Sequence, residues 1–470
     1  MTHLNQLSND HDTIISLCTP RGSGAIAIIR LSGDNALECV NPIAKLSSGK
    51  RLIDCSSHTI NHGHVVDPSA HAVIDEVMFM VMHGPKTFTG QHTVEINCHN
   101  NQFIIENIIA CAIEHGARLA QPGEFTKRAF LNNKIDLLQA ESINELIHAQ
   151  TELSLRKALG QLQGSLSNHF NELELDVVML LALVESAFEF VEEEQRDLAI
   201  DTTITTRTQE LVGRLAEVKQ HHNHQQQIKQ GIRLVLIGTV NAGKSTLFNT
   251  LVKKNRAIVT DIAGTTRDSI ESSRYVNGNF WLVIDTAGLR QTGDFIEQQG
   301  IERSLQEADQ ADMVILVVDS SRHLSEQEKQ TYQEIYQKYR DKSLVVFNKI
   351  DQQLPETSAY RALFPQATIL NVSGQHHVGI QELEQLIDQK IQQLFATLHS
   401  PFLLNQRQYN LIIEMEIKLK NIANSYLSGI EYELVAYQLK GILENISELT
   451  GKSITENVLD NVFSSFCVGK

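Results

Sequence analysis

The residues with the clearest chemistry are GTVNAGKS, residues 238–245, which match the phosphate-loop pattern of glycine, four residues, glycine, lysine and serine or threonine. An apolar run precedes them and a segment beginning TLFNTL follows, so we expect a strand before the loop and a helix after it. In that setting the glycines let the backbone approach phosphates, Lys244 reaches the β- and γ-phosphates and the Ser245 hydroxyl binds Mg²⁺. The stretch predicts a nucleoside triphosphate site.

Two further stretches can complete this site. In GTTRD, residues 264–268, Thr266 can give magnesium a second protein oxygen. In WLVIDTAGL, residues 281–289, Asp285 ends an apolar strand and can act on the metal indirectly, while the Gly288 N–H can sense the γ-phosphate. Leu289 then occupies the place where Ras-like GTPases typically have a glutamine that orients the attacking water. Either the chain does not hydrolyse nucleotide, or another residue does the work of the glutamine.

The stretch LVVFNKID, residues 344–351, predicts which base is bound. Asp351 offers two acceptor oxygens, which match the ring N–H and exocyclic amino group of guanine, and a polar site that loses its partner rejects the wrong base by roughly 10⁴. Asn348 would contact the other edge of the base and Lys349 would pack over it. Ser-Gly-Gln at 373–375 stands where GTPases usually have Ser-Ala-Lys, so this part of the pattern is the weakest.

The sequence therefore predicts GTP binding with magnesium held by Ser245 and Thr266. The nucleotide is expected to contact Asn241, Ala242, Gly243, Lys244, Ser245, Thr246, Thr260, Asp261, Ile262, Ala263, Gly264, Thr265, Thr266, Asp285, Thr286, Ala287, Gly288, Asn348, Lys349, Asp351, Ser373, Gly374 and Gln375.

The sequence pattern differs among three parts of the chain, and together these parts predict a multidomain α+β and α/β protein. Residues 1–125 mix short β-rich runs with glycine and proline and predict a small α+β domain. Residues 126–230 and 389–470 have helical periodicity and predict one discontinuous helical domain. Residues 231–388 alternate apolar strands with helices, which indicates a parallel α/β domain inserted into the helical one. A stripe at steps of three and four predicts a helical core or helix–helix seam: Leu155, Leu159, Leu162, Leu166, Phe170 and Leu173.

Composition limits the remaining possibilities. A chain of 470 residues with 42% hydrophobic and 20% charged residues is typical of a soluble globular protein of about three domains. No apolar run reaches the roughly 18 residues that span a bilayer, and the N-terminus lacks a signal-peptide pattern, so we expect a cytoplasmic protein. The six cysteines are scattered without CxxC pairs, which argues against a disulfide framework or a zinc site. The net charge of −16 argues against coating nucleic acid by bulk electrostatics.

The polar stretch KQHHNHQQQIKQG, residues 219–231, leads into the inserted domain. Its histidines at 221, 222 and 224 could bind a metal, but the glutamines and lysines around them favour a solvated linker at a domain boundary.

Several motifs together resemble the MnmE (TrmE) family of bacterial tRNA-modification GTPases, over essentially the whole chain and in the same domain order. They are Asn241 in the phosphate loop, TDIAGTTRD, DTAGLR, PGEFTKRAFLNNKIDLLQAE and the terminal FCVGK. The resemblance implies a homodimer and an N-terminal domain that binds a tetrahydrofolate one-carbon donor, as the 5-formyl or methylene derivative. It also implies an FAD-containing flavoprotein partner, MnmG, in a heterotetramer or larger complex, and a joint reaction that adds an aminomethyl or carboxymethylaminomethyl group to C5 of the wobble uridine of certain tRNAs.

The resemblance also implies an answer to the question raised by Leu289. A potassium ion would supply positive charge, bound by Asn241 and by the backbone carbonyls of Thr260, Ile262 and Thr265, and Glu297 would position the water. Without the resemblance, Asn241 can be a loop residue that caps locally and Glu297 a solvated carboxylate. The chain departs from the family at Val240, where a proline often stands, and at 373–375; the second departure leaves only fine nucleotide affinity in doubt.

For the folate site the family match points to Arg30, Glu95, Lys134 and Lys470. A pterin presents guanine-like donors to a carboxylate, and a glutamate tail attracts cations. Unaided, these residues would be ordinary surface charges. Near the C-terminus, Cys467 could assist one-carbon transfer, or the tail could be frayed. An apolar stripe predicts a docked final helix that carries the tail to a fixed place: Val458, Leu459, Val462, Phe463 and Phe466.

Two other functions stay open from the sequence. One is a GTP-driven switch in ribosome assembly, which would predict an appended RNA-binding module that the sequence does not contain. The other is a dimerising scaffold with negligible turnover, which Leu289 alone would favour. Potassium dependence of GTP turnover separates the scaffold from the family function.

Overall fold

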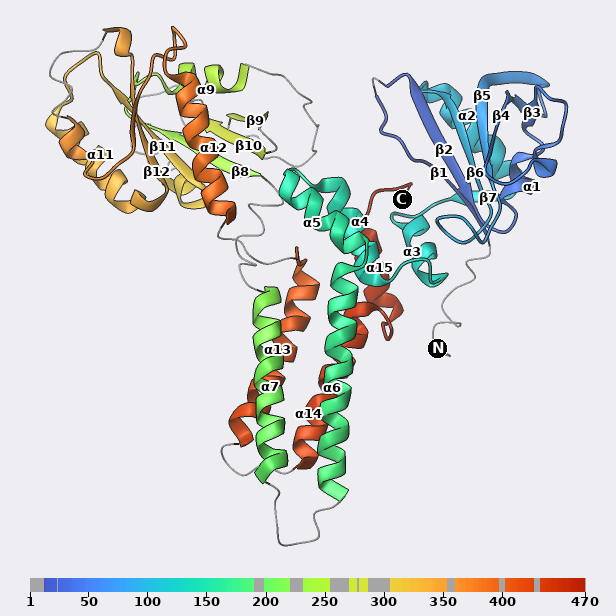
Figure 1. The fold of residues 1–470 in the computed structure, drawn as a ribbon. Coiled ribbons are helices and arrows are strands. Elements are labelled where there is room, and N and C mark those ends of the chain that lie inside the picture. The colour runs from blue at the N-terminus through green and yellow to red at the C-terminus, as the bar shows by residue number, and fades with distance from the viewer. Residues whose placement is uncertain are drawn as a thin grey trace. The chain divides into compact units, whose positions relative to one another are not determined.

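The computed structural model describes residues 12–22, 24–189, 198–219, 231–253, 270–276, 279–285, 305–352, 360–396, 402–426 and 432–469 (Figure 1). The chain forms two compact units. One comprises Met1–Ile147, Leu159–Leu215 and Gln406–Lys470, and the other comprises His148–Ala158 and Ala216–Asn405. Among the described helices, none combines the length and the apolar character that crossing a bilayer requires.

The first unit contains a seven-stranded mixed sheet in the order β3-β4-β5-β6-β2-β1-β7. Only the β1–β7 pair is parallel; the other neighbours are antiparallel. The strands are β1 (Thr13–Leu17), β2 (Ile26–Ser32), β3 (Ala44–Leu46), β4 (Thr59–Asp67), β5 (Ala72–Met82), β6 (Thr93–His99) and β7 (Ala117–Leu119).

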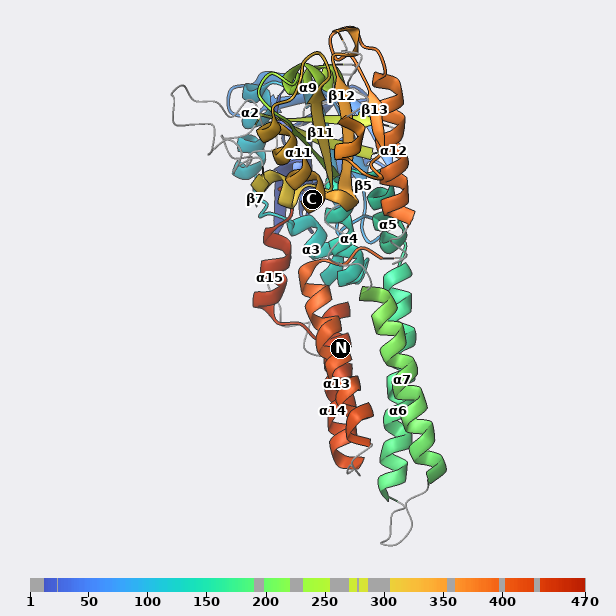
Figure 2. The same ribbon diagram turned by 90° about the vertical axis from the view of Figure 1, so that its left-hand side faces the viewer.

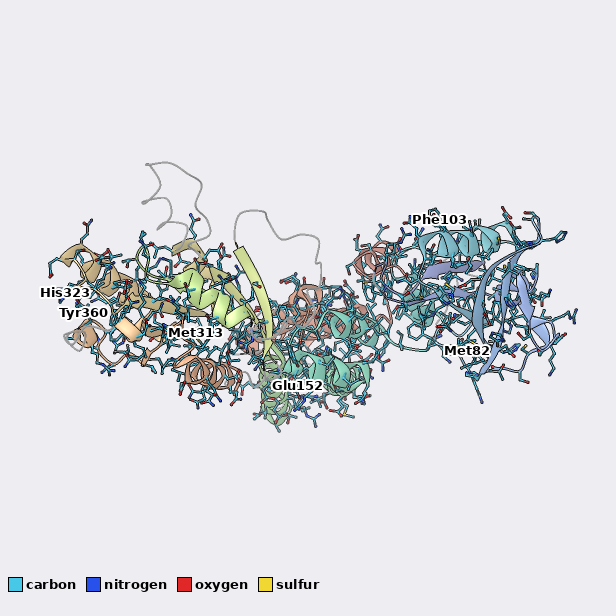
Figure 3. The ribbon with its side chains drawn as sticks, turned by 90° about the horizontal axis from the view of Figure 1, so that it is seen from above. Met82, Phe103, Glu152, Met313, His323 and Tyr360 are labelled. Atoms are coloured by element: carbon cyan, nitrogen blue, oxygen red, sulfur yellow. The ribbon has the colours of Figure 1, made fainter. Side chains whose placement is uncertain are left out.

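Alternation of side chains gives this sheet two different faces. On one face Ile29, Phe79 and Ile96 are fully buried in a core that includes residues of α1 (Ala36–Val40) and α2 (Gln102–Glu114). Their neighbours along β2 and β6, which include Arg30 and Glu95, point to the other face because successive side chains of a strand alternate. Figure 3 shows Phe103 of α2 on one side of the sheet and Met82 of β5 on the other. The predicted α+β domain is therefore a sheet with helices on one face.

The rest of the first unit is helical, as the periodicity predicts. After α3 (Glu124–Leu131) and α4 (Leu137–His148), four helices run side by side as a bundle in both Figure 1 and Figure 2. They are α6 (Ser165–Glu189), α7 (Leu198–Lys219), α13 (Gln406–Tyr426) and α14 (Tyr432–Thr450), and α15 (Glu456–Ser464) follows. The two parts of the helical sequence, far apart along the chain, thus pack together.

The predicted apolar stripe is correct for α6 and wrong before it. Leu166, Phe170 and Leu173 are fully buried, but Leu155 and Leu159 of α5 (Glu152–Leu162) are 46% and 45% exposed. The chain turns at residues 163–164, where Gly164 has a φ of 91°, so the helical phase that the stripe assumes is interrupted between α5 and α6.

The second unit contains a six-stranded sheet in the order β13-β12-β11-β8-β10-β9, parallel except for β9. Its strands are β8 (Ile232–Ile237), β9 (Ile270–Val276), β10 (Asn279–Asp285), β11 (Met313–Asp319), β12 (Ser343–Asn348) and β13 (Ile369–Asn371). The helices that pack around it include α9 (Lys244–Lys253), α11 (Glu326–Lys338) and α12 (Ile380–Ala396).

Both faces of this sheet are buried, as is usual for parallel strands. In β11, Met313, Ile315 and Val317 join the core beneath α9 and α12, while Val314 and Leu316 join the core beneath α11. Figure 2 shows the sheet between α11 and α12, and Figure 3 shows Met313 within it, with His323 and Tyr360 together at its margin. Because the strands other than β9 are parallel, their carboxyl ends lie along the same side of the sheet. In α/β proteins, ligands bind at this side.

Candidate GTP-binding site

The phosphate-loop residues leave the carboxyl end of β8 and enter α9 at Lys244, as the sequence predicts. Asn241 and Gly243 both have positive φ angles, 64° and 92°. A Cβ at Gly238 would lie 2.2 Å from the Val317 carbonyl oxygen, so the loop begins where only glycine fits. The first amide groups of α9 are thus presented to an anion at the start of a helix, with Ser245 and Thr246 exposed beside them.

The Lys244 side chain lies over this loop and is 8% exposed. Its Nζ donates to the carbonyl oxygens of Gly238 at 2.7 Å and Thr239 at 2.9 Å. Asp285 ends β10 and is paired in register with Leu236 of β8, so its buried carboxylate lies at the same edge of the sheet as the loop. The two predicted phosphate and metal elements therefore converge.

Asn348 joins the phosphate loop to the predicted base-binding residues. It is 2% exposed, and its Nδ2 donates to the carbonyl oxygen of Ala242 at 3.0 Å. Its Oδ1 accepts from the Gly374 N–H at 3.0 Å. A Cβ at Gly243 would lie 2.2 Å from Nδ2, so glycine is required there for a second reason. The sequence predicted that Asn348 contacts the base; the structure gives it loop-binding contacts.

Lys349 has a φ of 65° and its Nζ lies 2.7 Å from Oδ2 of Asp319, which ends β11. Burial works to raise the pKa of Asp319, yet hydrogen bonds from Lys349 and Ser321 outweigh it and hold that pKa below its ordinary value. A buried carboxylate thus holds the lysine that was predicted to pack over the base. Asp319 was missed from the sequence, although an apolar strand ending in aspartate was a visible signal.

Asp351 lies in a short helical turn, Ile350–Gln352, directly after this lysine. A hydrogen bond from the Ser373 side chain holds the pKa of Asp351 below its ordinary value, so the carboxylate is ionised at neutral pH. Oδ2 of Asp351 also lies 3.7 Å from Nε2 of His376. The hydrogen bond from Ser373 brings the start of the Ser-Gly-Gln stretch to Asp351, and within that stretch Ser373 and Gly374 are buried and Gln375 is exposed.

Several predicted residues lie outside the described residues. They are Thr260, Asp261, Ile262, Ala263, Gly264, Thr265, Thr266, Thr286, Ala287, Gly288, Glu297 and Lys470, and the histidines at 221, 222 and 224. The second magnesium ligand, the carbonyl ligands of potassium and the water-positioning glutamate thus stay predictions.

In the first unit the structure brings Arg30 and Glu95 together. They are register partners on β2 and β6, and Nε of Arg30 donates to Oε1 of Glu95 at 2.7 Å. The guanidinium also lies 5.7 Å from the ring centroid of Phe125 on α3. Lys134 donates instead to the Pro85 carbonyl oxygen at 2.9 Å. Two of the four predicted folate residues therefore form one charged pair on the sheet face opposite α1 and α2.

The predicted docking of the C-terminal tail is confirmed for residues 466–469. Phe463 and Phe466 are buried in a cluster with Phe130, and the Gly123 N–H donates to the Cys467 carbonyl oxygen at 3.3 Å. A Cβ at Gly123 would lie 2.6 Å from the Phe463 carbonyl oxygen, so this glycine permits the close approach.

The end of the tail reaches the carboxyl end of β1. The Cys18 thiol donates to the Gly469 carbonyl oxygen at 3.1 Å, and Cys467 is exposed. Cys18 was not singled out from the sequence, because nothing local to it shows that residues 451 positions away lie beside it.

Comparison with known proteins agrees with this geometry. The family model described as the MnmE helical domain matches residues 137–467, and the model described as the GTP-binding protein TrmE N-terminus matches residues 13–134. The chain belongs to the MnmE family.

Full-length members of the MnmE family are similar to this chain from end to end. The tRNA modification GTPase MnmE of Lactiplantibacillus plantarum is 37% identical over 98% of this chain and 99% of its own length. The protein of the same name from Geobacillus kaustophilus is 37% identical over 98% of this chain and 100% of its own length. A solved structure, the G domain of the T. maritima FeoB iron transporter, is 25% identical over 34% of this chain and 97% of its own length, with a TM-score of 0.26.

The base assignment predicts a change of nucleotide preference. We expect the intact protein to bind GTP over ATP, and Asp351→Asn to lose GTP affinity by roughly 10⁴ and to gain affinity for xanthosine triphosphate, whose ring offers an acceptor to the new amide. Equilibrium binding of the three nucleotides measures this, with the exposed Asp341→Asn as the control. Equal binding of ATP and GTP by the intact protein would refute the assignment.

Proposed function

We propose that this chain hydrolyses GTP with magnesium and takes part in tRNA modification. One observation carries the proposal: the phosphate loop, Asp285, Asn348 and Asp351 meet at the carboxyl edge of one parallel sheet, in a chain of the MnmE family. The exposed Ser245 hydroxyl and the buried carboxylate of Asp285, at the same edge of the sheet, are hard oxygens of the kind that suits Mg²⁺. Magnesium would neutralise charge on the phosphates when bound.

The proposed division of labour follows three domains. Residues 1–125 form the folate-binding and dimerising domain, residues 126–230 with 389–470 form the helical domain, and residues 231–388 form the GTPase domain. The protein acts in the cytoplasm as a homodimer. These boundaries place the GTP site in one domain and the Arg30–Glu95 pair in another, so the two chemistries are separate.

A potassium ion is the proposed source of the positive charge that an arginine supplies in other GTPases. Asn241 fits this role, because it is exposed within the phosphate loop and its amide oxygen is a suitable hard ligand. The carbonyls of Thr260, Ile262 and Thr265 would complete the ion's shell. Glu297 would orient the attacking water in place of the missing glutamine.

The potassium proposal predicts a cation-specific rate. GTP turnover is expected to be faster in potassium than in sodium at equal ionic strength, because potassium is the ion proposed to stabilise the developing charge. Asn241→Ala should remove the acceleration and retain GTP binding, whereas Asn249→Ala, an exposed residue of α9, should behave as the parent does. Steady-state phosphate release in the two salts measures this. Turnover independent of the cation would rule the ion site out.

The second proposed site binds a tetrahydrofolate derivative. Glu95 is held by Arg30 on a half-buried sheet face, and a carboxylate fixed in this way can accept the paired N–H donors of a pterin ring. Lys134 and Lys470 would bind the glutamate tail. With an MnmG-type FAD flavoprotein, the one-carbon unit would become part of an aminomethyl or carboxymethylaminomethyl group at C5 of the wobble uridine of certain tRNAs, and the exposed Cys467 would take part in that transfer.

The docked tail gives this second site its own test. Cys467→Ser and deletion of residues 467–470 should each abolish tRNA modification, assayed with the flavoprotein partner, while GTP hydrolysis stays at the parent rate because the GTP site does not use the tail. Ser465→Ala, an exposed change just before the tail, is the control. A deletion variant that modifies tRNA fully would show the tail to be dispensable.

A further inference from the structure

The first residues of the phosphate loop are hydrogen-bonded to a tyrosine of α11. Tyr332 is 1% exposed, and its hydroxyl lies between the end of β11 and the first residues of the loop. It donates to the Val317 carbonyl oxygen at 2.7 Å. It also lies 3.0 Å from the Thr239 N–H, which donates to it, and 3.2 Å from the Thr239 hydroxyl. In Figure 1, α11 lies on the side of the sheet where β11 and β12 are labelled.

The proton count fixes the direction of every bond. A tyrosine hydroxyl has one proton and can accept two hydrogen bonds. Because its proton is given to Val317, both bonds with Thr239 must be accepted by Tyr332, so the Thr239 hydroxyl is a donor here. The tyrosine oxygen is thus fully used, with two of its three bonds going to a single residue of the loop.

Both backbone polar groups of Thr239, its N–H and its carbonyl oxygen, are consequently hydrogen-bonded. Its N–H is bound by Tyr332 and its carbonyl oxygen accepts from Lys244 at 2.9 Å. A cavity of about 70 Å³ lies between the loop base and α11, lined by Ile237, Gly238, Thr239, Leu305, Thr331, Tyr332 and Ile335. Packing does not fill this space, so the hydrogen bonds from Tyr332 and Lys244 are what hold Thr239 at the base of the loop.

We propose that Tyr332 is a positioning residue for the nucleotide: it sets the phosphate loop through Thr239 and does not touch the nucleotide itself. The inference rests on the proposed phosphate-binding role of residues 238–246. Through Tyr332, the position of α11 is coupled to the position of the phosphate-binding amides.

The tyrosine is suited to this role over the whole physiological pH range. Burial raises the pKa of Tyr332 to about 12, so the hydroxyl keeps the proton that it gives to Val317. The arrangement therefore does not switch with pH.

The test compares two tyrosines of the same helix. Tyr336 lies one turn further along α11, is 3% exposed, contacts the same Phe364 ring and donates to the Pro365 carbonyl oxygen at 2.7 Å, away from the loop. Tyr332→Phe and Tyr336→Phe each remove one buried hydroxyl, so both should lower thermal stability. Only Tyr332→Phe should weaken GDP and GTP binding, by about tenfold, because the Thr239 N–H loses its acceptor.

The KM and kcat for GTP separate a positioning role from a general loss of stability. Loss of binding shared by ground and transition states raises KM without changing kcat, so Tyr332→Phe should raise KM for GTP about tenfold at nearly constant kcat. Thr239→Val, which loses the hydroxyl bond and retains the N–H bond, should fall between Tyr332→Phe and the parent. This second variant tests the proposal even where Tyr332→Phe does not fold.

Two outcomes would overturn the inference: equal nucleotide affinity in Tyr332→Phe and the parent, or equal weakening in Tyr332→Phe and Tyr336→Phe. Lys244→Ala distinguishes failure of the inference from failure of the proposed function. It should lose nucleotide binding in either case, and full binding by Lys244→Ala would instead contradict the phosphate-loop assignment itself.

Discussion

The GTP site depends on the buried side-chain amide of Asn348. One amide group binds two backbone groups that belong to different loops: its nitrogen donates to Ala242 and its oxygen accepts from Gly374. An amide can do this because it has a donor and an acceptor on one planar group. The phosphate loop, the residues proposed to recognise guanine and the Ser-Gly-Gln stretch are thereby fixed relative to one another, and such preorganisation lowers the entropy cost of binding a nucleotide.

Near that amide, at the carboxyl ends of the same strands, further contacts hold individual side chains and loop residues in place. Asp319 holds Lys349, Tyr332 holds Thr239, and Gly238 and Gly243 are the only residue type that fits where they stand. The Asp319–Lys349 pair joins the end of β11 to the loop that follows β12, and Tyr332 of α11 joins β11 to the loop that follows β8. The site is therefore a property of the strand order, with β8 between β10 and β11, more than of any one motif.

The sequence predicted most of the elements, since their signals are local. The apolar run before the phosphate loop, the strand ending at Asp285 and the phenylalanines of the final helix are each readable within about ten residues. The contacts that the sequence could not predict depend on strand register or on packing between distant parts of the chain. The pairing of Arg30 with Glu95 follows from the alignment of β2 with β6, and the contact of Cys18 with Gly469 from tail docking. The stripe through Leu155 was wrong because periodicity does not reveal a turn between two helices.

Asn348 is the residue that assembles the site, because it holds two loops together. Asn348→Ala leaves the Ala242 carbonyl and the Gly374 N–H without this partner, so we predict a loss of GDP and GTP affinity of roughly 100-fold. The measurement is equilibrium binding of both nucleotides, on protein whose thermal unfolding stays cooperative, with the exposed Asn371→Ala as the control. Affinity within about twofold of the parent would contradict the claim, because the loops would then be held without the amide.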